Sequence, residues 1–200
     1  MAHRRRRGRR PALSQGAEMM IDEHSPRERE VPLHEMSPVD RDAASAMWND
    51  YWRAHPDQVG LDDVPTVERF GDHAELSDAL LELVMSGRKR ATATLVKEFA
   101  ADGVPLPRVG SHWIACDASG APRVILRSTE LRLGTIADAD EAFAFDEAED
   151  DRSLEAWLVG HRRYWDRVCT ALEIEWSDDL EILFERFTVA WPETRGPLVG

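Results

Sequence analysis

The tryptophans of this 200-residue chain set the limits of its folded part, because all seven lie between residues 48 and 191. Large aromatic side chains need a core in which to be buried. Residues 1–44 consist mainly of Arg, Glu, Asp, Pro and Ser and hold few large apolar side chains. Such a segment cannot bury enough surface to offset its chain entropy. We therefore predict a disordered extension over 1–44, one domain over 45–192 and a short tail over 193–200.

The predicted extension begins with a run of arginines between residues 4 and 10. No apolar segment of about seven to fifteen residues follows this run, so it does not resemble a secretory signal. Met19 and Met20 leave open a second start of translation beyond the arginines. No stretch of the chain approaches the roughly 20 apolar residues that a membrane helix needs. We expect a cytoplasmic protein with no membrane partner.

The formal net charge is −13, even though six arginines lie within the first 17 residues. Binding to a duplex depends on neutralising phosphates, so extended contact with duplex DNA is not expected. Cys116 and Cys169 show no C-x-x-C spacing, and the seven histidines include no H-x-x-x-H pair. We predict no cofactor and no metal ligand, with a divalent ion at the acidic residues 146–151 as a minor alternative. The oligomeric state is left open.

The first elements of the domain follow from the spacing of its apolar residues. A helix that ends at His55-Pro56 is predicted by an aromatic stripe, which core packing explains better than base stacking: Trp48, Tyr51 and Trp52. A strand is predicted over 64–70. A second helix follows, with Asp72 as its N-terminal cap and Gly87 at its C-terminal end.

The remaining elements alternate between helices and strands. We predict a short helix over 95–101, strands over 112–117 and 122–133, a helix over 153–172 and a last strand over 180–191. The residues between 138 and 151 are interpreted as an acidic segment. This order predicts an α+β fold in which a small, mostly antiparallel β-barrel is flanked by helices.

Lys89 is one of only two lysines in an arginine-rich chain, and it lies where the helix that ends at Gly87 gives way to a strand. A lysine amine has a pKa that falls on desolvation, so it can act as a base or hold an anion, whereas arginine stays charged. The alternative is that Lys89 is an exposed cation beside Arg88 and Arg90.

The chain resembles the ASCH domain family over residues 46–191 in five motifs that occur in the order typical of the family. They are Phe70-Gly71-Asp72, the segment from Gly87 to Ala93, Pro107-Arg108-Val109-Gly110, the segment from Glu147 to Trp157, and Phe184-Glu185-Arg186-Phe187. ASCH domains belong to the PUA-like group, whose β-barrels commonly bind RNA or modified bases. The resemblance implies a PUA-like fold with a pocket at the barrel mouth for RNA or a nucleoside.

One bacterial branch of the family removes the acetyl group of N4-acetylcytidine with a lysine, a threonine and a glutamate. The resemblance implies that these catalytic positions are Lys89, Thr92 and Glu147, with Glu149 as the alternative glutamate. The family often has glycine after each of these glutamates, whereas Ala148 and Asp150 stand here. The backbone of this segment and the choice of glutamate are therefore left open.

Such a trio fits amide hydrolysis, which needs a nucleophile, a base and an acid. A threonine hydroxyl or a water would attack, a lysine with a lowered pKa would take a proton, and a carboxylate would protonate the leaving amine. We assign ligand binding to four further residues: Gly87, Arg88, Arg90 and Arg108. The alternatives are that Thr92 only fills a strand and Glu147 lies in a solvated loop. The domain would then be ribonuclease-like or a non-catalytic RNA-binding or interaction module.

Overall fold

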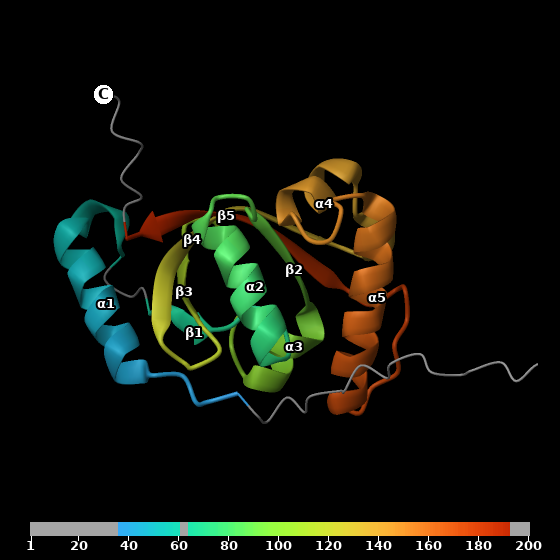
Figure 1. The fold of residues 1–200 in the computed structure, drawn as a ribbon, viewed down its shortest axis with the longest axis horizontal. Coiled ribbons are helices and arrows are strands. Elements are labelled where there is room, and N and C mark those ends of the chain that lie inside the picture. The colour runs from blue at the N-terminus through green and yellow to red at the C-terminus, as the bar shows by residue number, and fades with distance from the viewer. Residues whose placement is uncertain (1–35, 61–63, 193–200) are drawn as a thin grey trace, which may run out of the picture. The chain divides into compact units, whose positions relative to one another are not determined.

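The computed structural model describes residues 36–60 and 64–192, which form one α+β unit (Figure 1). Its sheet contains β1 (Thr66–Glu68), β2 (Ala91–Leu95), β3 (His112–Cys116), β4 (Pro122–Gly134) and β5 (Ile182–Trp191). The strands lie in the order β1-β3-β4-β5-β2. β1 pairs with β3 in parallel, and the other pairs are antiparallel.

The α+β class and the mostly antiparallel pairing are confirmed, but the β-barrel predicted from the sequence is wrong, because the sheet does not close. The sheet is a curled half-barrel with β1 at one edge and β2 at the other. Two register shifts between β4 and β5 are irregularities of the kind that bend and twist a sheet. Closure would require β1 to pair with β2. Because β1 has only three residues and its pairing is with β3, the described strands leave the sheet open.

Five helices of the described residues accompany the sheet (Figure 1): α1 (Arg41–Ala54), α2 (Ala74–Met85), α3 (Val96–Asp102), α4 (Glu141–Glu147) and α5 (Leu154–Ala171). Two short 3-10 turns cover Pro56–Gln58 and Ile136–Asp138. The helix α1 begins before the domain boundary expected at residue 45, because the Asp40 carboxylate accepts the Ala43 N–H and Ala44 is buried. Residues 1–35 of the expected extension and the tail over 193–200 lie outside the described residues.

The C-terminal end of α2 agrees with the prediction from the sequence, and the N-terminal end differs from it. Gly87 follows the C-terminal end of the helix with φ of 73°, a left-handed conformation that suits glycine, as predicted. The predicted cap at Asp72 is wrong, because the His73 side chain accepts the Leu76 N–H instead. Asp72 is buried and forms an ion pair of 2.7 Å with Arg167, which joins the start of α2 to α5.

The sheet separates its buried side chains between two faces. Phe184 on β5 packs in the core formed with α4 and α5, whereas Phe187 packs in the core formed with α2. Ala91 and Ala93 on β2 belong to the α4 and α5 core. Because side chains alternate along a strand, Thr92 lies on the opposite face, toward α2.

Candidate functional site

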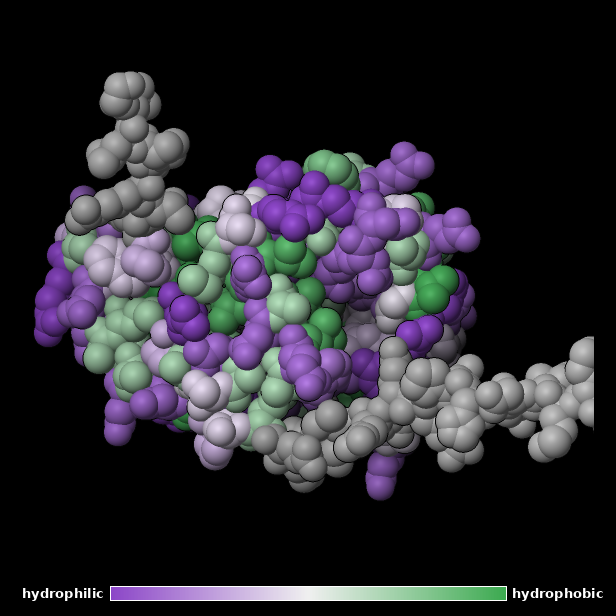
Figure 2. Space-filling view, in the orientation of Figure 1, coloured by the Kyte–Doolittle hydropathy of each residue, from purple (hydrophilic) through white to green (hydrophobic). Residues whose placement is uncertain are grey.

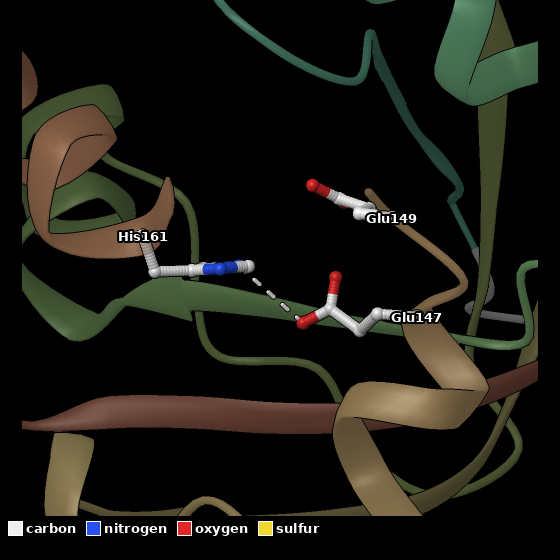
Figure 3. A group of neighbouring side chains, drawn as sticks. All are labelled: Glu147, Glu149 and His161. Atoms are coloured by element: carbon white, nitrogen blue, oxygen red, sulfur yellow. Dashed lines mark ion pairs between the residues drawn. The ribbon is translucent and has the colours of Figure 1, made fainter. Parts of the chain in front are cut away.

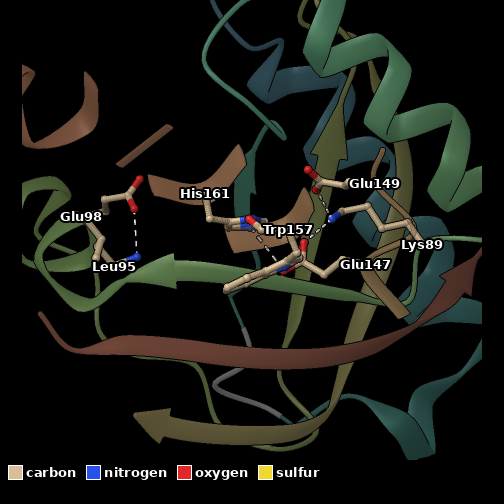
Figure 4. A network of polar contacts seen from close by, with 7 residues as sticks. All are labelled: Lys89, Leu95, Glu98, Glu147, Glu149, Trp157 and His161. Atoms are coloured by element: carbon tan, nitrogen blue, oxygen red, sulfur yellow. Dashed lines mark hydrogen bonds and ion pairs between the residues drawn. The ribbon is translucent and has the colours of Figure 1, made fainter. Parts of the chain in front are cut away.

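Lys89 is a buried cation at the junction between α2 and β2. Its backbone N–H bonds to the Leu83 carbonyl at the end of α2, and 1% of the residue is exposed. The ammonium Nζ donates to Glu147 Oε2 and to Glu149 Oε1, each at 2.6 Å (Figure 4). The interpretation of Lys89 as an exposed cation is therefore wrong.

Glu147 is the last residue of α4, and its carboxylate is saturated with partners. Oε2 binds Lys89, while Oε1 accepts the Trp157 indole N–H at 3.0 Å and lies 3.5 Å from His161 Nε2. Burial disfavours the charged form, but Lys89 and His161 outweigh it and lower the pKa of Glu147 to about 2. Glu147 is a buried anion and not a member of a solvated loop.

His161 and Trp157 stand one turn apart on α5, and together they hold Glu147. Nδ1 of His161 lies 3.0 Å from the Trp157 carbonyl oxygen, which only accepts, so Nδ1 carries a proton. The His161 ring stacks on the Trp157 indole with centroids 3.9 Å apart. Burial opposes the charge on His161, yet Glu147 raises the pKa of the imidazole above its ordinary value. The sequence showed these two residues only as part of the periodicity of a helix.

Glu149, two residues after Glu147, is less buried and has fewer partners. It is 25% exposed, and its hydrogen bond to Lys89 uses Oε1 alone. Ala148 and Asp150, which flank it, adopt φ of 60° and 45°, and Arg152 adopts 69°. This left-handed backbone is the one that glycine adopts without strain, whereas alanine, aspartate and arginine occupy it here. The turn brings Glu149 back onto the ammonium.

The environment of Lys89 reverses one expectation about its chemistry. Burial by itself would lower the pKa of the ammonium, but the charges of Glu147 and Glu149 outweigh burial and hold that pKa above the ordinary lysine value. The predicted base with a lowered pKa is thus wrong for this arrangement. Lys89 is a positive charge that two carboxylates fix in place.

Three residues of this cluster offer atoms of the kind that bind metal ions. Glu147, Glu149 and His161 each contribute one atom, and these atoms lie within 4.8 Å of one another (Figure 3). The Lys89 ammonium, however, lies 2.6 Å from both carboxylates. A divalent ion among these oxygens would face that positive charge at close range. The donor set therefore suits the ammonium, and we assign no metal to it.

The other residues singled out in the sequence occupy varied places. Thr92 is half-buried on β2, and within the described residues no hydrogen bond joins it to the Lys89 cluster. Arg88 is exposed. Arg90 forms an ion pair of 2.6 Å with Asp146. Arg108 is exposed in the loop before β3, and its backbone N–H donates to Ser111 Oγ at 2.8 Å.

Two aromatic rings, Phe70 and Trp113, connect the Lys89 cluster with the face of the sheet toward α2. Nζ of Lys89 lies 5.7 Å from the centre of the Phe70 ring, which packs on Trp113 at 5.0 Å. The Trp113 indole N–H donates to Glu185 Oε1 at 3.3 Å. The face beside α2 shows hydrophobic side chains next to hydrophilic ones (Figure 2). The site thus combines a buried ion cluster with a buried ring, Phe70, and a half-buried ring, Trp113.

The sequence of the domain matches a known family. The ASCH domain profile matches residues 66–190, so the chain belongs to the ASCH domain family. A crystal structure of a protein from Enterococcus faecalis V583 is 26% identical, covers 75% of this chain and 89% of its own, and has a TM-score of 0.66. The crystal structure of an ASCH domain from Lactobacillus crispatus JV V101 is 24% identical, covers 76% and 96%, and has the same TM-score.

The comparisons extend to the fold of the domain and not to a ligand. Both solved structures share the α+β architecture described above. No curated protein matches the chain in sequence. Among the helices of the described ranges, none combines the length and the hydrophobicity needed to cross a bilayer.

Proposed function

We propose that this ASCH domain binds a nucleoside with an acyl group on an amino nitrogen, of the N4-acetylcytidine type, and hydrolyses the amide bond. One observation carries the proposal: the buried Lys89 ammonium pairs with Glu149, whose second carboxylate oxygen is not used by that pair. An ammonium and a carboxylate side by side supply a positive group for a developing oxyanion and a base for water.

The reaction follows from these two charges. Glu149 takes a proton from a water molecule as the water oxygen bonds to the acyl carbon. Lys89 stabilises the negative charge that develops on the carbonyl oxygen. The carbon–nitrogen bond then breaks, and the proton held by Glu149 passes to the leaving nitrogen. The products are a carboxylic acid and the free amino nucleoside, so atoms and protons balance.

Glu147 and Thr92 take supporting roles in this proposal. Glu147 has both oxygens engaged and a pKa of about 2, so it positions Lys89 and exchanges no proton near neutral pH. Within the described part of the chain the Thr92 hydroxyl has no hydrogen bond to another side chain, which leaves it available to orient the ligand. Of the two candidate glutamates, Glu149 is therefore the catalytic residue.

The test is the substitution Glu149→Gln, which keeps the shape of the side chain and removes the base. We expect kcat for acetate release from N4-acetylcytidine to fall by about 10²–10⁴-fold with little change in KM, as for the loss of a general base. Glu155→Gln, at an exposed glutamate on α5, is the matched control. A wild-type protein that releases no acetate, or a Glu149→Gln protein with wild-type kcat, would refute the proposal.

A further inference from the structure

Glu185 on β5 is a buried carboxyl group with one oxygen left unpaired. The residue is 6% exposed. Oε1 accepts from Ser128 Oγ at 2.6 Å and from the Trp113 indole at 3.3 Å. No described residue donates a hydrogen bond to Oε2. Oε2 is not among the fully enclosed polar atoms that lack a partner, so this oxygen is open to a donor from outside the protein.

The neighbours of Glu185 connect it with the Lys89 cluster through two aromatic rings, Trp113 and Phe70. Thr92 lies directly opposite Glu185 in the β2 and β5 pair, so both side chains share the face toward α2. Trp113 is half-buried on the same face and packs on Phe70, which contacts the Lys89 ammonium. An acceptor, a hydroxyl and an aromatic ring therefore lie on one face of the sheet, and Phe70 links them to Lys89.

A purely structural role does not account for a carboxyl group at this position. The two donors from Ser128 and Trp113 use one oxygen, and an amide oxygen would serve them equally well. Burial raises the pKa of Glu185 above its ordinary value, and the hydrogen bonds from Ser128 and Trp113 do not cancel this effect. The second oxygen is the one that remains accessible, so a carboxyl group here offers an acceptor beyond what Ser128 and Trp113 require.

We propose that Glu185 determines specificity for the base of the ligand, because its Oε2 accepts an N–H of a planar nitrogen heterocycle that stacks on Trp113. Thr92 supplies a second polar contact on the same edge. The acyl nitrogen of the proposed substrate carries such an N–H, so this inference rests on the proposed function for the orientation of the ligand. It predicts that a base without an N–H on this edge is rejected.

The substitution Glu185→Gln tests the inference sharply. Glutamine keeps an oxygen for Ser128 and Trp113 but turns an N–H toward the ligand, so a donor meets a donor. We expect the Kd for cytidine, measured by calorimetry on the full chain, to weaken by about ten- to a hundredfold, as for a lost hydrogen bond to a charged group. N4,N4-dimethylcytidine, which lacks the N–H, should bind both proteins with the same weak affinity.

Two controls keep the outcome interpretable. Glu181→Gln, at an exposed glutamate next to β5, should bind cytidine as the wild type does. If Glu185→Gln does not fold, Thr92→Val should still weaken cytidine binding. Equal affinity of wild type and Glu185→Gln for cytidine, or no cytidine binding by the wild type, would overturn the inference. Because cytidine needs no turnover, binding that depends on Glu185 without acetate release would refute the hydrolysis alone.

Discussion

Two glutamates pack against helix α5, and their surroundings move their pKa values in opposite directions (Figure 4). Glu147 is fully buried beside Trp157 and has a pKa of about 2. Glu98, at the start of α3, is half-buried, and the Tyr164 hydroxyl donates to it at 3.5 Å. Burial raises the pKa of Glu98 to about 7. The more deeply buried glutamate is thus the stronger acid.

The difference arises from the charges that each carboxylate meets. Glu147 contacts the Lys89 ammonium and lies beside His161. Glu98 receives one backbone N–H from Leu95, at 2.9 Å, and its charged neighbour Asp102 is also negative. Depth alone therefore does not determine the protonation state, because a paired cation can outweigh desolvation.

Removal of the Lys89 cation, which pairs with Glu147, should produce the largest change in stability. Lys89→Met leaves two carboxylates facing each other, one of them fully buried, and should lower the free energy of unfolding at pH 7 by about 3–5 kcal/mol. The loss should shrink at pH 4, where the carboxylates take up protons. Lys97→Met, at the other lysine of the chain, is exposed and should change little in the same urea titration. Equal losses in the two variants would contradict the comparison.

Neutralising Glu98 should stabilise the protein, and the size of this effect should depend on pH. Its pKa of about 7 in the folded state exceeds the unfolded value of about 4.5, so stability is lost as pH rises between these values. Glu98→Gln, which keeps an oxygen for the Leu95 N–H, should therefore be more stable than wild type by about 1–3 kcal/mol at pH 8 and similar to it near pH 4. Glu82→Gln, exposed on α2, serves as the control. A gain that is the same at both pH values would rule out this interpretation.

Of the three changes, the loss of His161, which lies beside Glu147, should have the smallest effect on stability. Its pKa is raised in the folded state, so its stabilising effect is complete below about pH 6.5 and is lost as pH rises through the folded pKa. The pH-dependent part of the loss in His161→Gln should be about 1 kcal/mol at pH 6 and should fade toward pH 9. Thermal and urea unfolding at both pH values measure it. Arg163→Gln, exposed on the same helix, should show no such fading.

Local spacing predicted most of the elements but not all of them. The helix periodicity that begins at Leu154 and the turn at 118–120 between β3 and β4 both correspond to observed structure. The helix α4 was missed, because its seven residues lie in an acidic stretch whose periodicity is too short to recognise. The prediction of a β-barrel was wrong because closure depends on the length and the partner of β1, which local sequence patterns do not specify.

The candidate site, like the fold, was predicted only in part. The rarity of Lys89 and its place after Gly87 identified it in the sequence. Its raised pKa was not predictable, since the sequence does not show which carboxylates approach the amine. Trp157 and His161 carried one usable signal, a spacing of four residues on one face of a helix that follows the Glu147 motif.

The sequence by itself determined the features that depend on neighbours within one or two turns. The clearest example is the left-handed end of α2 at Gly87. Only the tertiary structure decided which charges meet, because Lys89 and Glu147 are 58 residues apart in the chain and 2.6 Å apart in space. Since the energy of a buried charge is set by the partners within a few ångströms, the separate chemistry of Glu147, Glu149 and Glu98 exists only in the folded protein.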